Sequence, residues 1–210
     1  MAGCFISLEG IEGAGKTTQM HRLAAWLQRL GYSVLTTREP GGTALGQSLR
    51  SLLLHHVLPE RSELLLYAAD RAAHVAQVLQ PALQRQQVVL CDRYTDSTVA
   101  YQGYGRGMDL HLIEQVNAIA TGGLMPDLTL WLDVPVEVGL RRVRGRGALN
   151  TIEQESLAFH ERVRQGYQAL AEQHPQRICR IDAASDTETV FKQIQAAIEG
   201  RWSAHASECQ

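Results

Sequence analysis

The chain has 210 residues, of which 45% are hydrophobic and 20% are charged. This length and composition are ordinary for a globular protein and suit one α/β domain with a sizeable core. The formal net charge of −2 argues against a general nucleic-acid binder, which is usually basic, so no nucleic-acid partner is expected.

Short apolar runs alternate along the chain with longer stretches of helical periodicity. This order predicts a doubly wound parallel sheet with helices on its faces. Strands are expected at residues 4–9, 33–38, 87–92, 128–133 and 177–182. Helices are expected at 16–30, 43–55, 60–85, 109–121, 136–144, 151–172 and 186–202, and Pro81 should kink or end the third of them. The tail from residue 203 is expected to be loose, and residues 1–210 are expected to form a single domain.

Features of the whole chain also predict where the protein resides. No apolar stretch approaches about 18 residues, so no membrane-spanning segment is expected. The N-terminus enters an expected strand directly and does not resemble a signal peptide. Cys4, Cys91 and Cys179 lie in apolar runs, which indicates buried free thiols and a reducing compartment. We therefore expect a cytoplasmic location and no membrane partner.

Residues 10–17 match the phosphate-loop pattern G-x-x-x-x-G-K-[ST] at every fixed position. They lie between an expected strand and an expected helix, as this loop requires. Glycines allow backbone N–H groups to point at phosphate oxygens, Lys16 adds positive charge, and the Thr17 hydroxyl can ligate Mg²⁺. We expect the loop to bind the triphosphate of ATP, rather than to be a glycine-rich turn. The residues expected to hold it are Gly10, Ile11, Glu12, Gly13, Ala14, Gly15, Lys16, Thr17 and Thr18.

Three polar residues lie at the ends of two further strands. Asp92 ends an apolar strand, where it could help Thr17 to hold Mg²⁺ through water or could cap a helix. Arg38 ends another strand and Arg93 follows Asp92, both on the edge of the sheet that carries the phosphate loop. Two guanidinium groups there indicate a second phosphate site, although each could instead form a surface ion pair.

Two helical faces could bind a planar base. Tyr67 and Arg71 are four residues apart on one expected helix, so an aromatic ring lies beside a guanidinium group. Plain packing, with a pair between the arginine and the preceding aspartate, is the alternative. Thr98, Tyr101 and Gln102 share a second face, and the amide of Gln102 suits the edge of a base. This face could also be solvated.

An arginine-rich segment occurs at about residues 141–152. It begins with Arg141, Arg142, Arg144 and Arg146, interrupted by two glycines in the sequence RRVRGRG. In a nucleotide enzyme such a segment is typical of a lid that closes on the transferring phosphates. The alternative is an exposed basic end of a helix.

With these motifs in place, the chain resembles bacterial thymidylate kinases over about residues 4–200. The phosphate loop alone is not specific, but TREPGG and DRY beside this loop are. The matching stretches are ISLEGIEGAGKTT (6–18), TREPGG (37–42), LRSLLL (49–54), DRY (92–94), AYQGYGRG (100–107), PDLTLWLD (126–133) and IEQE (152–155).

The resemblance implies a kinase that transfers the γ-phosphoryl group of ATP to dTMP, giving dTDP and ADP for dTTP biosynthesis. It also implies Mg²⁺, a homodimer, and the P-loop nucleoside-monophosphate-kinase fold with a five-stranded parallel sheet. The type is the one with an acidic residue in the phosphate loop, here Glu12, and an arginine-rich lid.

The same resemblance assigns roles in a thymidylate-binding region at about residues 38–107. Arg71 would bind a thymine carbonyl, and Tyr67 would stack on the base in a position where phenylalanine is more usual. Tyr101 would crowd the 2′ side of the sugar and so favour deoxyribose. The residues expected to bind the acceptor are Arg38, Pro40, Leu54, Tyr67, Arg71, Arg93, Ser97, Thr98, Tyr101 and Gln102.

The resemblance also implies the catalytic residues. Glu12 would contact the region of the sugar 3′-hydroxyl, and Arg93 would bind the acceptor phosphate. The expected catalytic residues are Lys16, Arg93, Arg144, Arg146 and Glu12, and the expected metal ligands are Thr17 and Asp92. The sequence leaves open whether Arg142, Arg144 or Arg146 reaches the transferring phosphate.

Two other functions remain compatible with a phosphate loop. One is a kinase for a different nucleoside monophosphate or for a deoxynucleoside. The other is a nucleotide-dependent switch or binding module. A guanine-specific switch should carry an N/T-K-x-D motif after a central strand, and the sequence has none. The dinucleotide pattern G-x-G-x-x-G with a ribose carboxylate is also missing.

Overall fold

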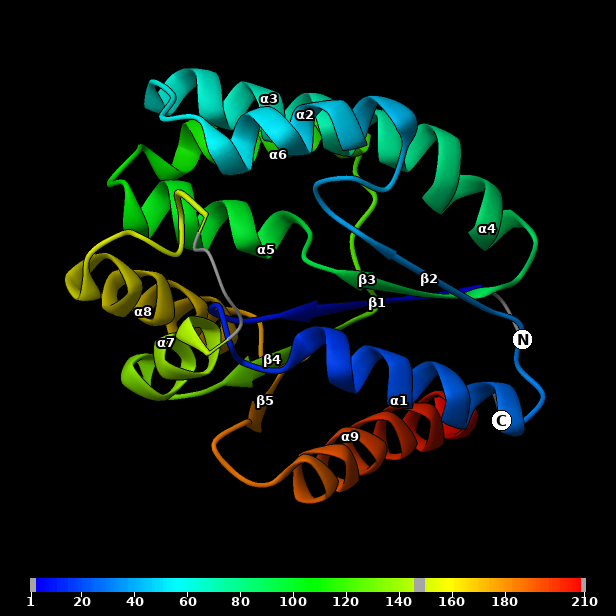
Figure 1. Ribbon diagram of the computed structural model, residues 1–210. Helices are drawn as coiled ribbons and strands as arrows, with labels where there is room; N and C mark the ends of the chain where they lie inside the picture. The colour runs from blue at the N-terminus through cyan, green and yellow to red at the C-terminus, as the bar shows by residue number, and fades with distance from the viewer. Residues whose placement is uncertain (1–2, 146–149, 209–210) are drawn as a thin grey trace.

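The computed structural model describes residues 3–145 and 150–208 (Figure 1). Its centre is a five-stranded sheet with the order β2-β3-β1-β4-β5. Each neighbouring pair of strands is parallel, which confirms the predicted fold class. The strands are β1 (Cys4–Glu9), β2 (Val34–Arg38), β3 (Val88–Asp92), β4 (Leu128–Asp133) and β5 (Ile178–Asp182). Each begins within one residue of its predicted position and ends where predicted.

Helices cover both faces of the sheet (Figure 1). On one face, α1 (Lys16–Arg29) and α9 (Thr187–Glu208) lie side by side. On the other side, α3 packs between α2 and α6. The α5 segment continues into a π-helical turn, η2, that packs on α8. The bounds of these elements are α2 Ala44–His55, α3 Glu60–His74, α5 Thr95–Thr98, η2 Val99–Gly105, α6 Leu110–Thr121, α7 Val136–Arg144 and α8 Leu157–Gln173.

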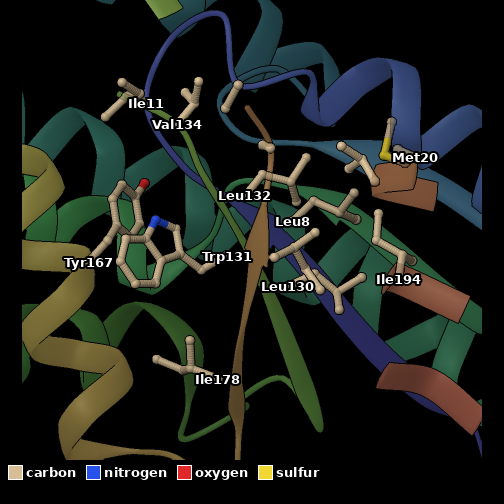
Figure 2. Close-up of a cluster of buried hydrophobic side chains, with 14 of the residues drawn as sticks. Leu8, Ile11, Met20, Leu130, Trp131, Leu132, Val134, Tyr167, Ile178 and Ile194 are labelled. Atoms are coloured by element: carbon tan, nitrogen blue, oxygen red, sulfur yellow. The ribbon is translucent and has the colours of Figure 1, made fainter. Parts of the chain in front are cut away.

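Buried apolar side chains hold these layers together. Figure 2 shows one cluster, in which Leu8 of β1 and Leu130 of β4 lie beside Met20 of α1 and Ile194 of α9. Strands buried on both faces carry apolar residues almost continuously, which is why the strand positions could be predicted. Cys91 is buried as expected, whereas Cys4 and Cys179 are only partly buried.

The parallel register places the functional motifs along one edge of the sheet. Arg38 of β2 is level with Asp92 of β3, and Asp92 is level with Leu8 of β1. The phosphate loop therefore leaves β1 directly beside the end of β3. Ligand sites in such sheets lie at the carboxyl ends of the strands.

The helix predicted at residues 60–85 changes its hydrogen-bond pattern before the proline. The α-helical pattern of α3 ends at His74, and a π-helical turn, η1, spans Val75–Leu79. Pro81 lies in the first turn of the next segment, α4 (Gln80–Gln84), where its missing N–H is tolerated. The change of helical pattern therefore lies directly before Pro81, and the helix ends three residues after it, at Gln84.

Two other helix boundaries differ from the prediction. Residues 151–156 form turns, because the backbone N–H of Asn150 donates to Glu153 while that of Glu153 donates back to the Asn150 side chain. Helix α8 begins only at Leu157, after the cap Ser156. The tail is helical as far as Glu208, since no proline or glycine follows Gly200 to end α9, so residues 203–208 are not loose.

None of the helices in the described part of the chain is long and apolar enough to cross a membrane.

Candidate functional site

A cavity of about 470 Å³ opens at the carboxyl edge of the sheet. It is bounded by the phosphate loop, the ends of β2 and β3, helices α2 and α3, and the α5–η2 segment. The predicted residues that line it are Glu12, Gly13, Gly15, Lys16, Thr17, Thr18, Arg38, Pro40, Leu54, Tyr67, Arg71, Asp92, Arg93, Ser97, Thr98, Tyr101 and Gln102. Lining residues that the sequence did not single out are Glu39, Arg50, Asn150, Ile152 and Glu153.

The phosphate loop joins β1 to α1 and wraps around the side chain of Lys16. The Lys16 Nζ atom donates to the carbonyl oxygens of Gly10, at 2.9 Å, and of Ile11, at 3.0 Å. Burial of Lys16, which is 8% exposed, and the nearby Arg93 lower its pKa to about 8, against the carboxylates around it. Because α1 begins at Lys16, its free N–H groups lie next to this charge, and together they form an anion site.

Three predicted loop residues contribute backbone only. The side chains of Ile11 and Ala14 are buried in the hydrophobic core, where Figure 2 shows Ile11 beside Val134. Gly10 does not line the cavity, but its carbonyl oxygen is used by two cations, as described below. Any contact of these residues with a ligand would therefore be made by the backbone.

Thr17 and Asp92 are brought together as predicted. The Thr17 hydroxyl donates to Asp92 Oδ2 at 2.8 Å, across the gap between the loop and the end of β3. A hydroxyl and a carboxylate oxygen are suitable donors for Mg²⁺, which usually keeps several waters and takes one or two protein carboxylates plus phosphates. The described residues hold no larger cluster of metal-binding side chains. The pair therefore fits Mg²⁺ brought in with a nucleotide.

Arg93 is held by several partners at once. Its NH1 atom donates to Gly10 O at 3.1 Å and to Ser97 Oγ at 3.2 Å, and its NH2 atom donates to Glu12 Oε1 at 2.7 Å. The NH2 atom also lies 3.1 Å from the Tyr101 hydroxyl. The backbone at Arg93 has φ of 74°, a conformation that a residue with a side chain rarely adopts. Such strain is typical of functional sites.

Glu12 is the counterpart of Arg93 on the loop. Burial alone would raise the pKa of Glu12, but Arg93, His160, Lys16 and Tyr101 together lower it to about 2. The Tyr101 hydroxyl lies within 2.8 Å of both carboxylate oxygens. Glu12 is therefore an anion at neutral pH that fixes both Tyr101 and Arg93. His160 is fully buried with its Nδ1 atom 3.5 Å from Glu12, a contact from α8 that no local sequence signal predicts.

Glu9, at the end of β1, forms the floor beneath Arg93. It is fully buried and accepts hydrogen bonds from Tyr94 N at 2.6 Å, Ser97 Oγ at 2.6 Å and the Tyr167 hydroxyl at 3.0 Å. Burial and the nearby Asp96 raise the pKa of Glu9 to about 7, although its hydrogen bonds and Arg93 oppose the rise. The sequence gives no signal for this role, because Glu9 ends a strand whose other residues are nearly all apolar.

The raised pKa of Glu9 predicts a pH dependence of stability. Between pH 4.5 and about 7, folded Glu9 keeps a proton that the unfolded chain has lost, so the free energy of unfolding falls as pH rises. The full fall is on the order of 3 kcal/mol. The Glu9→Gln variant lacks this titrating group. Urea unfolding at about pH 5 and about pH 7.5 should therefore show that the free energy of unfolding falls more for the wild type than for the variant. An equal fall in both proteins would contradict the prediction.

Arg71 is a buried cation at the back of the cavity, 2% exposed. Its Nε atom donates to Glu39 at 2.8 Å, its NH1 atom to Thr98 at 2.9 Å and Asn117 at 2.7 Å, and its NH2 atom to Tyr94 O at 3.1 Å. The alternative of a pair with the preceding aspartate is wrong, since that carboxylate accepts from the Gly41 N–H instead. The strong fixation of Arg71 argues for a ligand-binding role rather than a chance position.

Gln102 lies in η2, and its side chain is tied to α3. Its Nε2 atom donates to Glu63 Oε1 at 2.6 Å, and Glu63 also pairs with Arg106 at 3.2 Å. Tyr67, four residues further along α3, lines the cavity with its ring half-buried, and burial raises the pKa of its hydroxyl. Tyr67, Arg71 and Gln102 therefore all line the same cavity.

Two further arginines line the cavity. Arg38 is exposed at the end of β2, while Arg50 of α2 donates to Pro40 O at 2.8 Å. Burial and the neighbouring Arg38 lower the pKa of Arg50. The sequence prediction did not include Arg50 as a second cation next to Arg38, although Arg50 lies within the LRSLLL stretch together with Leu54. The pair adds positive charge on the side where an acceptor phosphate is expected.

Among the described residues of the predicted lid, no arginine lines the cavity. Arg144 lies at the end of α7 and lines a second pocket with Glu137 and Leu157. Arg146 lies outside the described residues. Arg142 instead donates to Gly13 O at 3.3 Å and to Ala183 O at 3.1 Å, so it joins the phosphate loop to the β5–α9 connection.

Helix α7 also packs directly on the phosphate loop. A Cβ atom added to Gly13, which has φ of 74°, would lie 2.1 Å from the carbonyl oxygen of Gly139 in α7. A Cβ atom on Gly139 would lie 2.5 Å from Glu12 O. Residue 13 is therefore restricted to glycine by contact as well as by conformation, and residue 139 by contact alone.

Comparisons with known proteins agree with this geometry. A family model described as Thymidylate kinase matches residues 8–194. A thymidylate kinase from Trichormus variabilis is 60% identical over 200 residues, covering 93% of this chain and 95% of that protein. One from Thermosynechococcus vestitus is 55% identical over 217 residues, covering 96% and 90%. A crystal structure of thymidylate kinase from Ehrlichia chaffeensis has a TM-score of 0.78 at 36% identity, covering 94% of this chain and 100% of that one.

Proposed function

The chain belongs to the thymidylate kinase family, which converts dTMP to dTDP for dTTP synthesis, and we propose that this chain does so with ATP and Mg²⁺ in the cavity described above. One observation carries the proposal. Lys16 Nζ and Arg93 NH1 both donate to the Gly10 carbonyl oxygen, at 2.9 and 3.1 Å. Two cations held this close repel each other, and anions placed on either side of them relieve the repulsion. A donor and an acceptor phosphate would be such anions.

The donor phosphates fit the loop side of this pair. The backbone N–H groups at the start of α1 and the charge of Lys16 would bind their oxygens. Thr17 and Asp92 would hold Mg²⁺, which neutralises charge on the transferring phosphate when bound. We place the triphosphate of ATP here.

The acceptor phosphate fits the side of Arg93. The phosphate monoester of dTMP is mostly dianionic at pH 7, so its oxygen needs no general base to attack. What the site must supply is alignment and screening of two anions. Arg93 is oriented for this by Glu12 and Ser97, while Arg38 and Arg50 add charge on the outer wall.

The nucleoside fits the remaining part of the cavity. The Tyr67 ring offers a face for stacking, and Arg71 and Gln102 offer polar groups for the edge of a base. Tyr101, fixed by Glu12, would lie against the sugar. Thr98 would contribute mainly by accepting a hydrogen bond from Arg71.

We assign the lid to residues 141–152 within a single kinase domain spanning the chain. Its arginines would complete the charge around the transferring phosphate, and Arg142, already joined to Gly13, would reach it with a smaller displacement than Arg144. Arg144 would have to leave the second pocket.

We further propose a cytoplasmic homodimer. Cys91 and Cys179 form no disulfide bond, which suits a reducing compartment. Large apolar side chains are exposed on α2, α3 and α6, namely Leu45, Leu52, Leu65, Leu112 and Ile119. Exposed apolar surface of this kind favours association between copies. Sedimentation or light scattering would give twice the 23.2 kDa mass of the chain if the proposal holds.

The proposed acceptor is tested by ADP release from ATP in a coupled assay. The acceptors to compare are dTMP, dUMP, dCMP, dGMP and thymidine. A clear preference for dTMP is expected. Equal activity on all five would refute the proposal, and activity on thymidine alone would show a nucleoside kinase.

A further inference from the structure

The direction of the Gln102 amide is set by a residue outside the cavity. Gln102 lines the cavity, whereas Glu63, which accepts its Nε2–H, does not. Building on the proposed function, we propose that Glu63 is a positioning residue that makes the pocket select a base edge carrying N–H at the point facing Gln102.

Glu63 is held in an ion pair. Its Oε2 atom accepts from Arg106 NH2 at 3.2 Å, and Arg106 also pairs with Glu155. Beside this guanidinium group, Glu63 is a carboxylate, and an ionised carboxylate only accepts hydrogen bonds. Gln102 must therefore present its NH₂ group to Glu63. Its carbonyl oxygen Oε1 is then left for the cavity, and no described residue donates to that atom.

Arg71 provides the complementary group beside it. Four of the five N–H groups of Arg71 donate to Glu39, Thr98, Asn117 and Tyr94 O, which leaves one on NH2 for a ligand. Thr98, bonded to Arg71, lies four residues before Gln102 on the same helical segment, so the guanidinium and the amide are neighbours.

A donor beside an acceptor matches one kind of pyrimidine edge. Thymine and uracil carry a carbonyl oxygen next to N3–H, which pairs with this arrangement. Cytosine carries an amino group next to an unprotonated nitrogen, so both of its groups face the wrong partner. A site that leaves polar groups unpaired discriminates strongly. Selection thus depends on which end of the Gln102 amide faces inward.

The variant Glu63→Gln should reverse which end of the Gln102 amide faces the cavity. Arg106 only donates, and it lies closer to Oε2, at 3.2 Å from NH2, than to Oε1, at 3.5 Å from Nε. We therefore expect the amide oxygen to take the position of Oε2 and the amide nitrogen to lie opposite Gln102. Gln102 must then turn its carbonyl oxygen towards this nitrogen. Its NH₂ group faces the cavity, where it opposes N3–H of thymine.

The test compares dTMP with 5-methyl-dCMP, which share the methyl group and differ only at this edge. In Glu63→Gln, the ratio of kcat/KM for dTMP over 5-methyl-dCMP should fall roughly 10- to 100-fold. The fall should lie mainly in KM for dTMP, while kcat/KM for 5-methyl-dCMP holds or rises. In the double variant E63Q/Q102E, residue 102 is a carboxylate with two acceptor oxygens. One can accept from the amide at residue 63, and the other faces N3–H of thymine, so the preference for dTMP should return.

Controls separate this role from a structural one. Glu60→Gln, on an exposed turn of the same helix, should leave the ratio unchanged. An equal fall of kcat/KM for both substrates in E63Q, which leaves the ratio of the two values unchanged, would overturn the inference. If E63Q does not fold, Glu63→Ala frees the amide to rotate and should also lower the ratio. A wild type inactive on dTMP would instead refute the proposed function itself.

Discussion

Turnover is expected to be lost when Lys16 is replaced by alanine, while the protein remains folded. Lys16 is the only side chain of the phosphate loop that places a full positive charge at the donor site, where developing charge must be stabilised. Removing one such group typically costs at least about a hundredfold to a thousandfold in rate. We expect kcat for dTMP phosphorylation to fall by at least about a thousandfold, with little change in KM for dTMP.

The fold should tolerate this change. Burial lowers the pKa of Lys16 to about 8, which means that burying its charge costs free energy when the protein folds at neutral pH. Alanine removes that cost along with the two hydrogen bonds to the loop. Lys192, exposed on α9, provides a matched control whose alanine variant should keep full activity. Wild-type-like turnover of Lys16→Ala in the coupled assay would exclude the mechanism.

The second large effect is expected at Arg93. The Arg93→Met variant keeps a similar length and the same backbone strain, but it lacks the charge and the planar fork. Loss of an arginine that acts on the transferred or accepting phosphate costs roughly 10³- to 10⁵-fold. We expect kcat/KM for dTMP to fall in this range. Arg93→Lys should recover only part of it, because an ammonium group cannot bind Glu12 and a phosphate in the fixed geometry of a guanidinium.

Arg93→Met should also change the pH dependence of stability, through Glu12. The pKa of Glu12 is lowered to about 2 in the folded protein, so this carboxylate stabilises the fold above pH 4.5, and its contribution is lost as pH falls towards 2. Without Arg93 much of that contribution disappears. Chemical unfolding should therefore show a difference in the free energy of unfolding between wild type and variant that is full at pH 7 and becomes smaller below pH 4.5. A difference that does not vary with pH would show that Arg93 and Glu12 are not coupled.

The parts of the fold that the sequence predicted are those determined by nearby residues. Strand β3 was placed to within one residue because an apolar run and its flanking turns lie side by side in the chain. The phosphate loop and Asp92 were found for the same reason. Helix α8 was extended too far because the mutual hydrogen bonds of Asn150 and Glu153, which hold a turn, are not visible as a change in periodicity.

The parts that were missed depend on contacts between distant segments. Glu9 and His160 lie about 150 residues apart in the chain, and their roles arise only when α8 packs over the end of β1. The partner of Arg71 was assigned to its neighbour because sequence shows adjacency, whereas the fold brings in Glu39. Arg144 was placed on the correct helix, but the direction of its side chain depends on how α7 rests on the loop.

The contact between Gly13 and Gly139 limits how this enzyme could evolve. The phosphate loop has no room for a side chain at residue 13, because a Cβ atom there would meet the carbonyl oxygen of Gly139. Placing a cation at this position of the loop would therefore require α7 to be displaced in the same step. Because a single substitution at either glycine would damage the fold first, a charge at residue 13 can be gained only together with a compensating change in α7.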